Sequence, residues 1–300
     1  FLCDAIGKRL TSTLGYTLLY DTRDNRLRPT RGHSLSISQD FAGLGGDVRY
    51  IRTQFNADKH FRVTDSGFIF SLSAEGGYVH PLENRGSPAL GIDDVRLTDR
   101  FYLGEPQIRG FDIRGVGPRV QRIFFDGGIE NGVPVNVPRL DRKQIQDDAI
   151  GGRAYYLARA ELQIPLGSGA KELGLRPSVF IDAGAVFKVT TPILQTIQQK
   201  SAASATTPSL PLFYTVNTSG TTPVLETTTV ATNPDGSARV PVLQFEERFF
   251  GDSWKPRVSV GVGVNWNSPF GPFRIDIARA LLKEPGDDTK LFTFNVGTQF

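Results

Sequence analysis

The sequence has no methionine, a single cysteine and three histidines among its 300 residues. Because Met is missing even at position 1, we expect a processed product or the C-terminal part of a longer protein. Cys3 alone cannot form a disulfide within the chain. His33, His60 and His80 lie far apart and lack the spacing of metal ligands. We therefore expect no metal site and no cofactor.

Long apolar runs and strong net charge are also missing. No stretch approaches the roughly 20 consecutive apolar residues that a membrane-spanning helix needs. This excludes helical spans but not membrane strands, which need only about 9–11 residues with half of the side chains facing lipid. The formal net charge is +3 and the basic residues are scattered. A nucleic-acid partner is therefore not indicated.

Helical periodicity is almost absent, whereas alternation of apolar and polar residues is widespread. In RVSVGVGVNW, the residues from Val258 to Trp266 with even numbers are apolar, and those between them are Ser, Gly and Asn. Nine segments show this pattern, at roughly residues 10–21, 32–41, 47–59, 67–80, 151–165, 174–188, 255–268, 272–283 and 290–300. The sequence therefore predicts an all-β chain. Its strands are longer than those of soluble proteins, which usually have about five or six residues.

The connections between these segments alternate in length. Those after the first, third, fifth and seventh segments are short, whereas 81–150 and 189–254 are very long. Short turns on one side and long loops on the other are typical of an antiparallel transmembrane β-barrel. A soluble sandwich is the alternative, because its strands alternate too. Since 189–254 is rich in Thr, Ser and Pro, we expect it to be a flexible outer loop.

Several motifs in order resemble one family. Residues 108–118 read IRGFDIRGVGP, residues 180–184 read FIDAG, and residues 284–288 read EPGDD. With DTRDN at 21–25 and the last nine residues, they resemble the BamA family of outer-membrane insertases, within a superfamily of barrel insertases and transporters. The resemblance covers nearly the whole chain. It implies a barrel of sixteen strands, of which this chain holds the last nine, with the POTRA domains and the first strands absent.

The resemblance also implies that the connection 81–150 folds inward and that Arg109 contacts Asp182. Strand parity points Asp182 the same way, and it places Glu161 on the polar face of 151–165. An arginine inside needs such partners, because an unpaired buried charge is costly. The alternative is a glycine-rich surface turn with a solvated arginine. The expected site comprises Ile108, Arg109, Gly110, Phe111, Gly117 and Pro118 in the loop, and Glu161, Asp182 and Gly184 in the wall.

No catalytic constellation is found, so we expect no enzyme. The GVGV stretch at 261–264 is better interpreted as small inward-facing strand residues than as a phosphate loop. Asp287 and Asp288 are better interpreted as a polar turn than as a calcium site.

The C-terminal strand is where we expect the mechanism. Its apolar face has Phe292, Phe294, Val296 and Phe300, and Gly297 is a plausible bend. The resemblance implies a weak seam there, through which unfolded β-barrel proteins enter the lipid of a Gram-negative outer membrane with the help of assembly lipoproteins. A two-partner secretion transporter or a TamA-like translocation barrel is the alternative. A passive porin would not explain Arg109 together with Asp182.

Overall fold

The computed structural model describes residues 8–26, 28–166, 174–203, 208–219, 222–268 and 271–296. The chain forms two compact units. The first, which we call the wall unit, contains residues 1–119, 149–192 and 250–300. The second, the loop unit, contains residues 120–148 and 193–249. In the described residues, no helix is long and apolar enough to cross a membrane.

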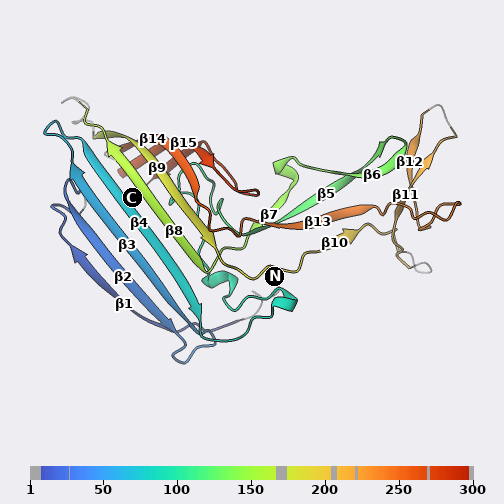
Figure 1. Cartoon of the computed structure of the whole chain (residues 1–300), viewed down its shortest axis with the longest axis horizontal. Helices are drawn as coiled ribbons and strands as arrows, with labels where there is room; N and C mark the ends of the chain where they lie inside the picture. Colours follow the sequence, from blue (N-terminus) through green and yellow to red (C-terminus); the bar gives the residue numbers. More distant parts are fainter. Residues whose placement is uncertain are drawn as a thin grey trace. The chain divides into compact units, whose positions relative to one another are not determined.

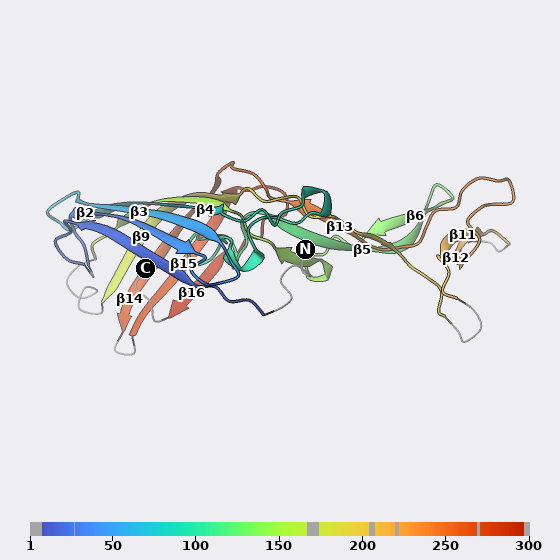
Figure 2. The ribbon, with the colours of Figure 1, turned by 90° about the horizontal axis from the view of Figure 1, so that it is seen from below.

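The wall unit is built on one antiparallel sheet of nine strands (Figure 1). The strands follow one another in chain order across the sheet. They are β1 (Thr13–Asp21), β2 (Gly32–Ala42), β3 (Tyr50–Arg62), β4 (Ile69–Pro81), β8 (Ala154–Gln163), β9 (Leu175–Phe187), β14 (Arg257–Ser268), β15 (Gly271–Leu282) and β16 (Phe292–Val296). Each corresponds to one predicted segment, so the all-β prediction is confirmed. Figure 2 shows that the sheet curves, because β14–β16 run at a steep angle to β1–β3.

The two faces of this sheet differ in polarity. Large apolar side chains are exposed on the outer face of every strand of this sheet except β8; examples are Leu18, Ile37, Phe55, Leu72, Ile181, Val262, Ile277 and Phe294. The inner face buries charged and small polar residues, among them Asp182, Ser259 and Asp276. A soluble sandwich would bury its apolar face against a second sheet. An exposed apolar face opposite a polar one is instead the arrangement of a membrane barrel wall.

The hydrophobic core of the wall unit lies on the inner side of the sheet. One cluster consists of Leu103, Ile108, Phe111, Val116, Leu157 and Val186. A second consists of Ala42, Val48, Tyr50, Val79 and Val95. Both join sheet residues to the connection between β4 and β8, which contains the short 3-10 helices η2 (Pro88–Leu90) and η3 (Leu97–Asp99). The part of this connection up to residue 118 therefore packs on the wall.

The loop unit was not foreseen as a folded body. Its sheet contains β5 (Arg119–Glu130), β6 (Val133–Pro138), β7 (Gln146–Ala149), β10 (Thr196–Gln198) and β13 (Leu243–Phe250). The strands β11 (Phe213–Asn217) and β12 (Val224–Thr228) form a separate pair, and η4 (Arg142–Gln144) precedes β7. Two expectations therefore need correction: residues 120–148 of the connection expected to fold inward belong to the loop unit, and 189–254 contains four strands. Most of these strands are short, so they show too little periodicity to be recognised.

We predict that adjacent residues of β3 differ in access to water. Phe55 is exposed on the apolar face, and its neighbour Asn56 lies on the inner face. In the full-length protein in a bilayer, Asn56→Cys is expected to react with a membrane-impermeant maleimide, and Phe55→Cys is expected to stay unlabelled until the membrane is dissolved. Equal labelling of the two variants in intact membranes would contradict this orientation of the sheet.

Candidate functional site

Residues 101–118, which we call the inner loop, pack against the inner face of the sheet. Ile108 and Phe111 are fully buried, together with Leu103, against Leu157 of β8 and Val186 of β9. Burying a side chain of this size contributes about 1.5–3 kcal/mol. This burial is the physical reason why a loop contains large apolar residues.

Arg109 is the polar centre of the inner loop. Its Nε donates to Asp182 Oδ2 at 2.7 Å and its Nη2 to Asp182 Oδ1 at 2.6 Å, while its backbone N–H donates to Oδ2 at 3.0 Å. Its Nη1 donates to Glu161 Oε2 at 2.7 Å. The two carboxylates that strand parity turned inward are thus the two that the arginine contacts. The bidentate geometry is the one that guanidinium and carboxylate groups favour.

The FIDAG stretch of β9 supplies three inward residues to this site. The Arg109 guanidinium lies 3.4 Å from the centroid of the buried Phe180 ring, a cation–π contact. Asp182 follows two residues later on the same face. At Gly184, a Cβ atom would lie 3.1 Å from Leu103 Cδ2 and 2.8 Å from a backbone oxygen. The glycine therefore leaves room for the inner loop.

Two glycines of the inner loop have conformations that other residues rarely adopt. Gly110 has a φ of 84°, and a Cβ there would lie 3.1 Å from the Cβ of Ser259 on β14. Gly117 has a φ of 108°, and a Cβ there would overlap Val186. Pro118 follows, and its carbonyl accepts the Ile150 N–H at 2.9 Å. The glycines thus allow the loop to turn while lying directly on the wall.

A second anchor holds the inner loop to the connection between β15 and β16. Asp112 N–H donates to the Asp288 carbonyl at 3.0 Å, and Asp288 N–H donates to the Gly115 carbonyl at 2.8 Å. Lys290 N–H donates to the Gly110 carbonyl at 3.2 Å. The EPGDD turn and the residues after it are therefore joined to the inner loop by backbone hydrogen bonds.

Asp287 of this turn binds an arginine. The Asp287 carboxylate accepts from Arg257 Nε at 3.0 Å, and both side chains are fully buried. It also accepts the Glu284 N–H at 2.7 Å. Among the described residues, no group of three His, Cys, Asp or Glu side chains is placed to hold a metal ion.

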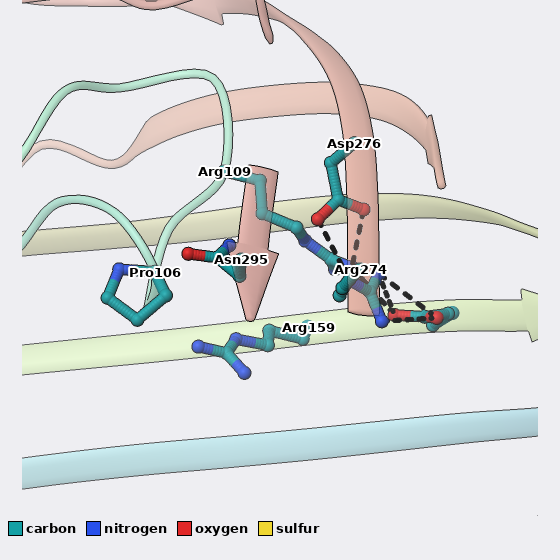
Figure 3. Close-up of a pocket in the computed structure, with 7 residues that line it drawn as sticks. Pro106, Arg109, Arg159, Arg274, Asp276 and Asn295 are labelled. Carbon is teal, nitrogen blue, oxygen red and sulfur yellow. Dashed lines mark hydrogen bonds and ion pairs between the residues drawn. The ribbon is translucent and has the colours of Figure 1, made fainter. Parts of the chain in front are cut away.

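Two further residues of the site, Arg274 and Asp276 of β15, were not among the site residues expected from the sequence. Arg274 Nε donates to Asp276 Oδ2 at 2.8 Å (Figure 3). Its Nη2 donates to Glu161 Oε2 at 3.3 Å. These groups surround a small polar cavity of about 40 Å³ together with Pro106, Arg109, Arg159 and Asn295. Three arginines and three carboxylates, counting Asp182, thus meet beside the inner loop.

The first part of the connection between β4 and β8 is held by hydrogen bonds to Asp93. Its Oδ1 accepts from Arg153 Nε and from the Val95 N–H, both at 2.8 Å, and its Oδ2 accepts the Thr190 N–H at 2.6 Å. Burial alone would raise the pKa of Asp93, but the hydrogen bonds from Arg153 and Thr190 outweigh it and hold the pKa below its usual value.

The residues expected at the seam lie on the last strand. Phe292, Phe294 and Val296 of β16 are all exposed on the apolar face. Gly297 and Phe300 lie outside the described residues. Within the described residues, β16 pairs with β15 from Phe273 to Ile277, and the Ala278 N–H donates to the Leu291 carbonyl at 2.9 Å.

Comparison with known proteins assigns this arrangement to a family. A model of the Omp85 superfamily domain matches residues 3–300. The chain belongs to the Omp85 superfamily. The inner loop and the inward residues of β9 are therefore parts of an Omp85 barrel, and the resemblance seen in the sequence is confirmed.

Relatives within the superfamily include assembly factors of two kinds. The chain is 29% identical over 294 residues to the outer membrane protein assembly factor BamA of Neorickettsia risticii, covering 98% of this chain and 28% of that protein. It is 30% identical over 185 residues to the human sorting and assembly machinery component 50 homolog, covering 59% of this chain and 32% of that protein. The chain thus spans about a third or less of the length of these relatives.

A solved structure shows the same fold. The crystal structure of BamA from Haemophilus ducreyi lacking POTRA domains 1–3 superposes with a TM-score of 0.58, at 20% sequence identity. The match covers 94% of this chain and 41% of that chain. The nine-stranded sheet is accordingly a segment of an outer-membrane β-barrel wall.

We predict that Arg109→Ala destabilises the full-length protein by about 3–5 kcal/mol, because it leaves Asp182 buried without its partner. The matched control is Arg139→Ala, which removes an exposed ion pair with Asp126 and is expected to cost at most about 1 kcal/mol. Denaturant unfolding of both variants in detergent measures the difference. Equal stabilities of the two variants would show that the buried pair contributes nothing.

The Asp93 contacts predict an acid-sensitive connection. Because the pKa of Asp93 is lower in the folded protein, its contribution to stability is complete above the unfolded value of about 3.9 and is lost as the pH falls through the folded pKa. Amide exchange at Val95 and Thr190 is therefore expected to accelerate below about pH 4, beyond its intrinsic pH dependence. In Asp93→Asn this extra acceleration is expected to disappear. If it persisted in that variant, another group would be responsible.

Proposed function

We propose that this chain is the C-terminal barrel portion of a protein that folds β-barrel proteins into an outer membrane, through a seam at β16. The observation that carries the proposal is the position of β16. Within the described residues it is the last strand of the sheet, it pairs with β15, and no strand pairs with its other edge. This edge strand is the seam that we propose.

An edge strand offers a binding site for another strand. Backbone N–H and C=O groups without partners cost several kcal/mol each in lipid. An incoming polypeptide satisfies them by adding a strand to the edge, which is recognition by β-augmentation. The exposed apolar side chains of Phe292, Phe294 and Val296 support a position of this edge against lipid chains. The edge, normally an aggregation hazard, becomes the template.

The inner loop supports this role because it fixes the wall beside the seam. Its ion pairs reach β8 and β9, and its backbone pairs with the connection that leads into β16. The strand edge can open while the remaining wall keeps its shape. No bond chemistry, nucleotide or metal is needed, since strand pairing and lipid burial supply the driving force.

The partners follow from this mechanism. Unfolded outer-membrane β-barrel proteins are the substrates, and outer-membrane lipid surrounds the seam. Assembly lipoproteins act through POTRA domains elsewhere in the full-length protein. We place the protein in a Gram-negative bacterium, because the bacterial relative aligns with 98% of the chain and the human relative with 59%.

Locking the seam tests the proposal. In the full-length protein, Phe294→Cys is paired with a cysteine at the facing position of the first barrel strand and oxidised. Insertion of an unfolded barrel protein into proteoliposomes is expected to fall to the level of empty vesicles and to recover on reduction.

The matched control is a disulfide between two strands that do not form the seam. Val262 of β14 and Ile277 of β15 face each other on the same exposed side of the sheet. A disulfide between cysteines at these positions is expected to leave insertion unchanged. Insertion at the normal rate by the seam-locked protein would rule out the seam as the working surface. A secretion or translocation barrel, the alternative, would insert no barrel substrate under either condition.

A further inference from the structure

The β15 side chain of Arg274 connects two parts of the molecule that have separate roles in the proposed function. We propose that Arg274 is a positioning residue that ties the inner loop to the terminal hairpin, which consists of β15 and β16. This inference rests on the proposed function for its biological meaning. The contacts that carry it are independent of that function.

Arg274 is nearly buried and lies between two carboxylates. Its Nε donates to both Asp276 oxygens, at 2.8 and 3.0 Å. Its two Nη atoms lie 3.3–3.4 Å from the Glu161 oxygens, and its Nη1 also donates to Asn265 Oδ1 at 3.3 Å. If Arg274 served only to neutralise Asp276, its neighbour on β15, the contacts with β8 would not be needed.

Glu161 is shared between the inner loop and the hairpin. It accepts from Arg109 at 2.7 Å and from Arg274 at 3.3 Å. The resulting chain of charges runs from Asp182 through Arg109, Glu161 and Arg274 to Asp276. It begins at Asp182 on β9, passes through the inner loop, and ends at Asp276 on β15, the strand that pairs with β16.

A small residue on β14 leaves space for these side chains to reach across the inner face of the sheet. Two strands, β9 and β14, lie between β8 and β15 in the sheet. Gly263 of β14 pairs with Asp276, and a Cβ there would overlap Asp276 Oδ1 and lie 3.2 Å from Arg274 Nη2. A side chain at Gly263 would therefore displace the ion pair. This accounts for Gly263 in the GVGV stretch.

The terminal hairpin also contacts the inner loop at its other end. Lys290 Nζ donates to the buried Glu105 carboxylate at 2.8 Å, near the backbone pairing of Asp288 with the loop. On β16 itself, Asn295 lines the same polar cavity as Arg109 and Arg274. These inner contacts add to the backbone pairing of β15 with β16 in holding the hairpin against the wall.

Hydrogen exchange in the full-length protein tests the tie directly. Arg274→Gln is expected to accelerate amide exchange in both residues 108–115 and residues 291–296 by about tenfold or more, the factor that ~1.4 kcal/mol produces in an opening equilibrium. Arg248→Gln, which removes an exposed ion pair with Glu246 in the loop unit, is the matched control and is expected to change neither segment.

A double variant separates positioning from charge neutralisation. Arg274→Gln combined with Asp276→Asn removes the arginine together with the carboxylate that it would leave unpaired. Exchange in the two segments is expected to stay fast in the double variant, because the bridge to Glu161 is still missing. Return of exchange to the wild-type rate would show that Arg274 only neutralises Asp276 and would overturn the proposal, as would wild-type exchange in the single variant.

An insertion assay on the same variants separates this inference from the proposed function. Fast exchange together with altered insertion supports both. Fast exchange with an unchanged insertion rate supports the tie and contradicts the role of the seam. The two ideas can therefore fail independently.

Discussion

A buried carboxylate sets the main constraint on the inner face of this wall. Asp182 is fully buried on β9, and an uncompensated charge in that place would cost several kcal/mol. Its compensating charge, Arg109, lies in a loop and reaches it through three hydrogen bonds. The buried charge of the sheet is therefore compensated only when the inner loop lies against it. The burial of Ile108 and Phe111 follows from the same placement.

Small residues on β9 and β14 accommodate this arrangement. Gly184 leaves space for Leu103, Ser259 lies beside Gly110, and Gly263 leaves space for Asp276. Large side chains in these places would push the loop into the lumen and stretch the ion pairs. The alternation of valine with glycine and serine on β14 thus satisfies lipid on one face and the inner loop on the other.

The sequence predicted those features that depend on local periodicity. The nine wall strands follow from alternation, and the inward direction of Asp182 and Glu161 follows from strand parity. The contact between Arg274 and Glu161 could not be predicted this way, because it crosses two intervening strands and depends on their registers. The loop unit escaped prediction for a related reason: β5 and β13 pair across more than 100 residues of sequence, and their neighbours are short. The functional role of the inner loop stays a prediction.

The connection between β15 and β16 has an unusual consequence for how this protein can vary. Surface connections generally tolerate insertions and deletions. Here the backbone of Asp288 and Lys290 is in register with Asp112, Gly115 and Gly110. Adding or removing one residue would shift that register and turn each side chain to the opposite face. The length of this short segment is therefore fixed from both ends.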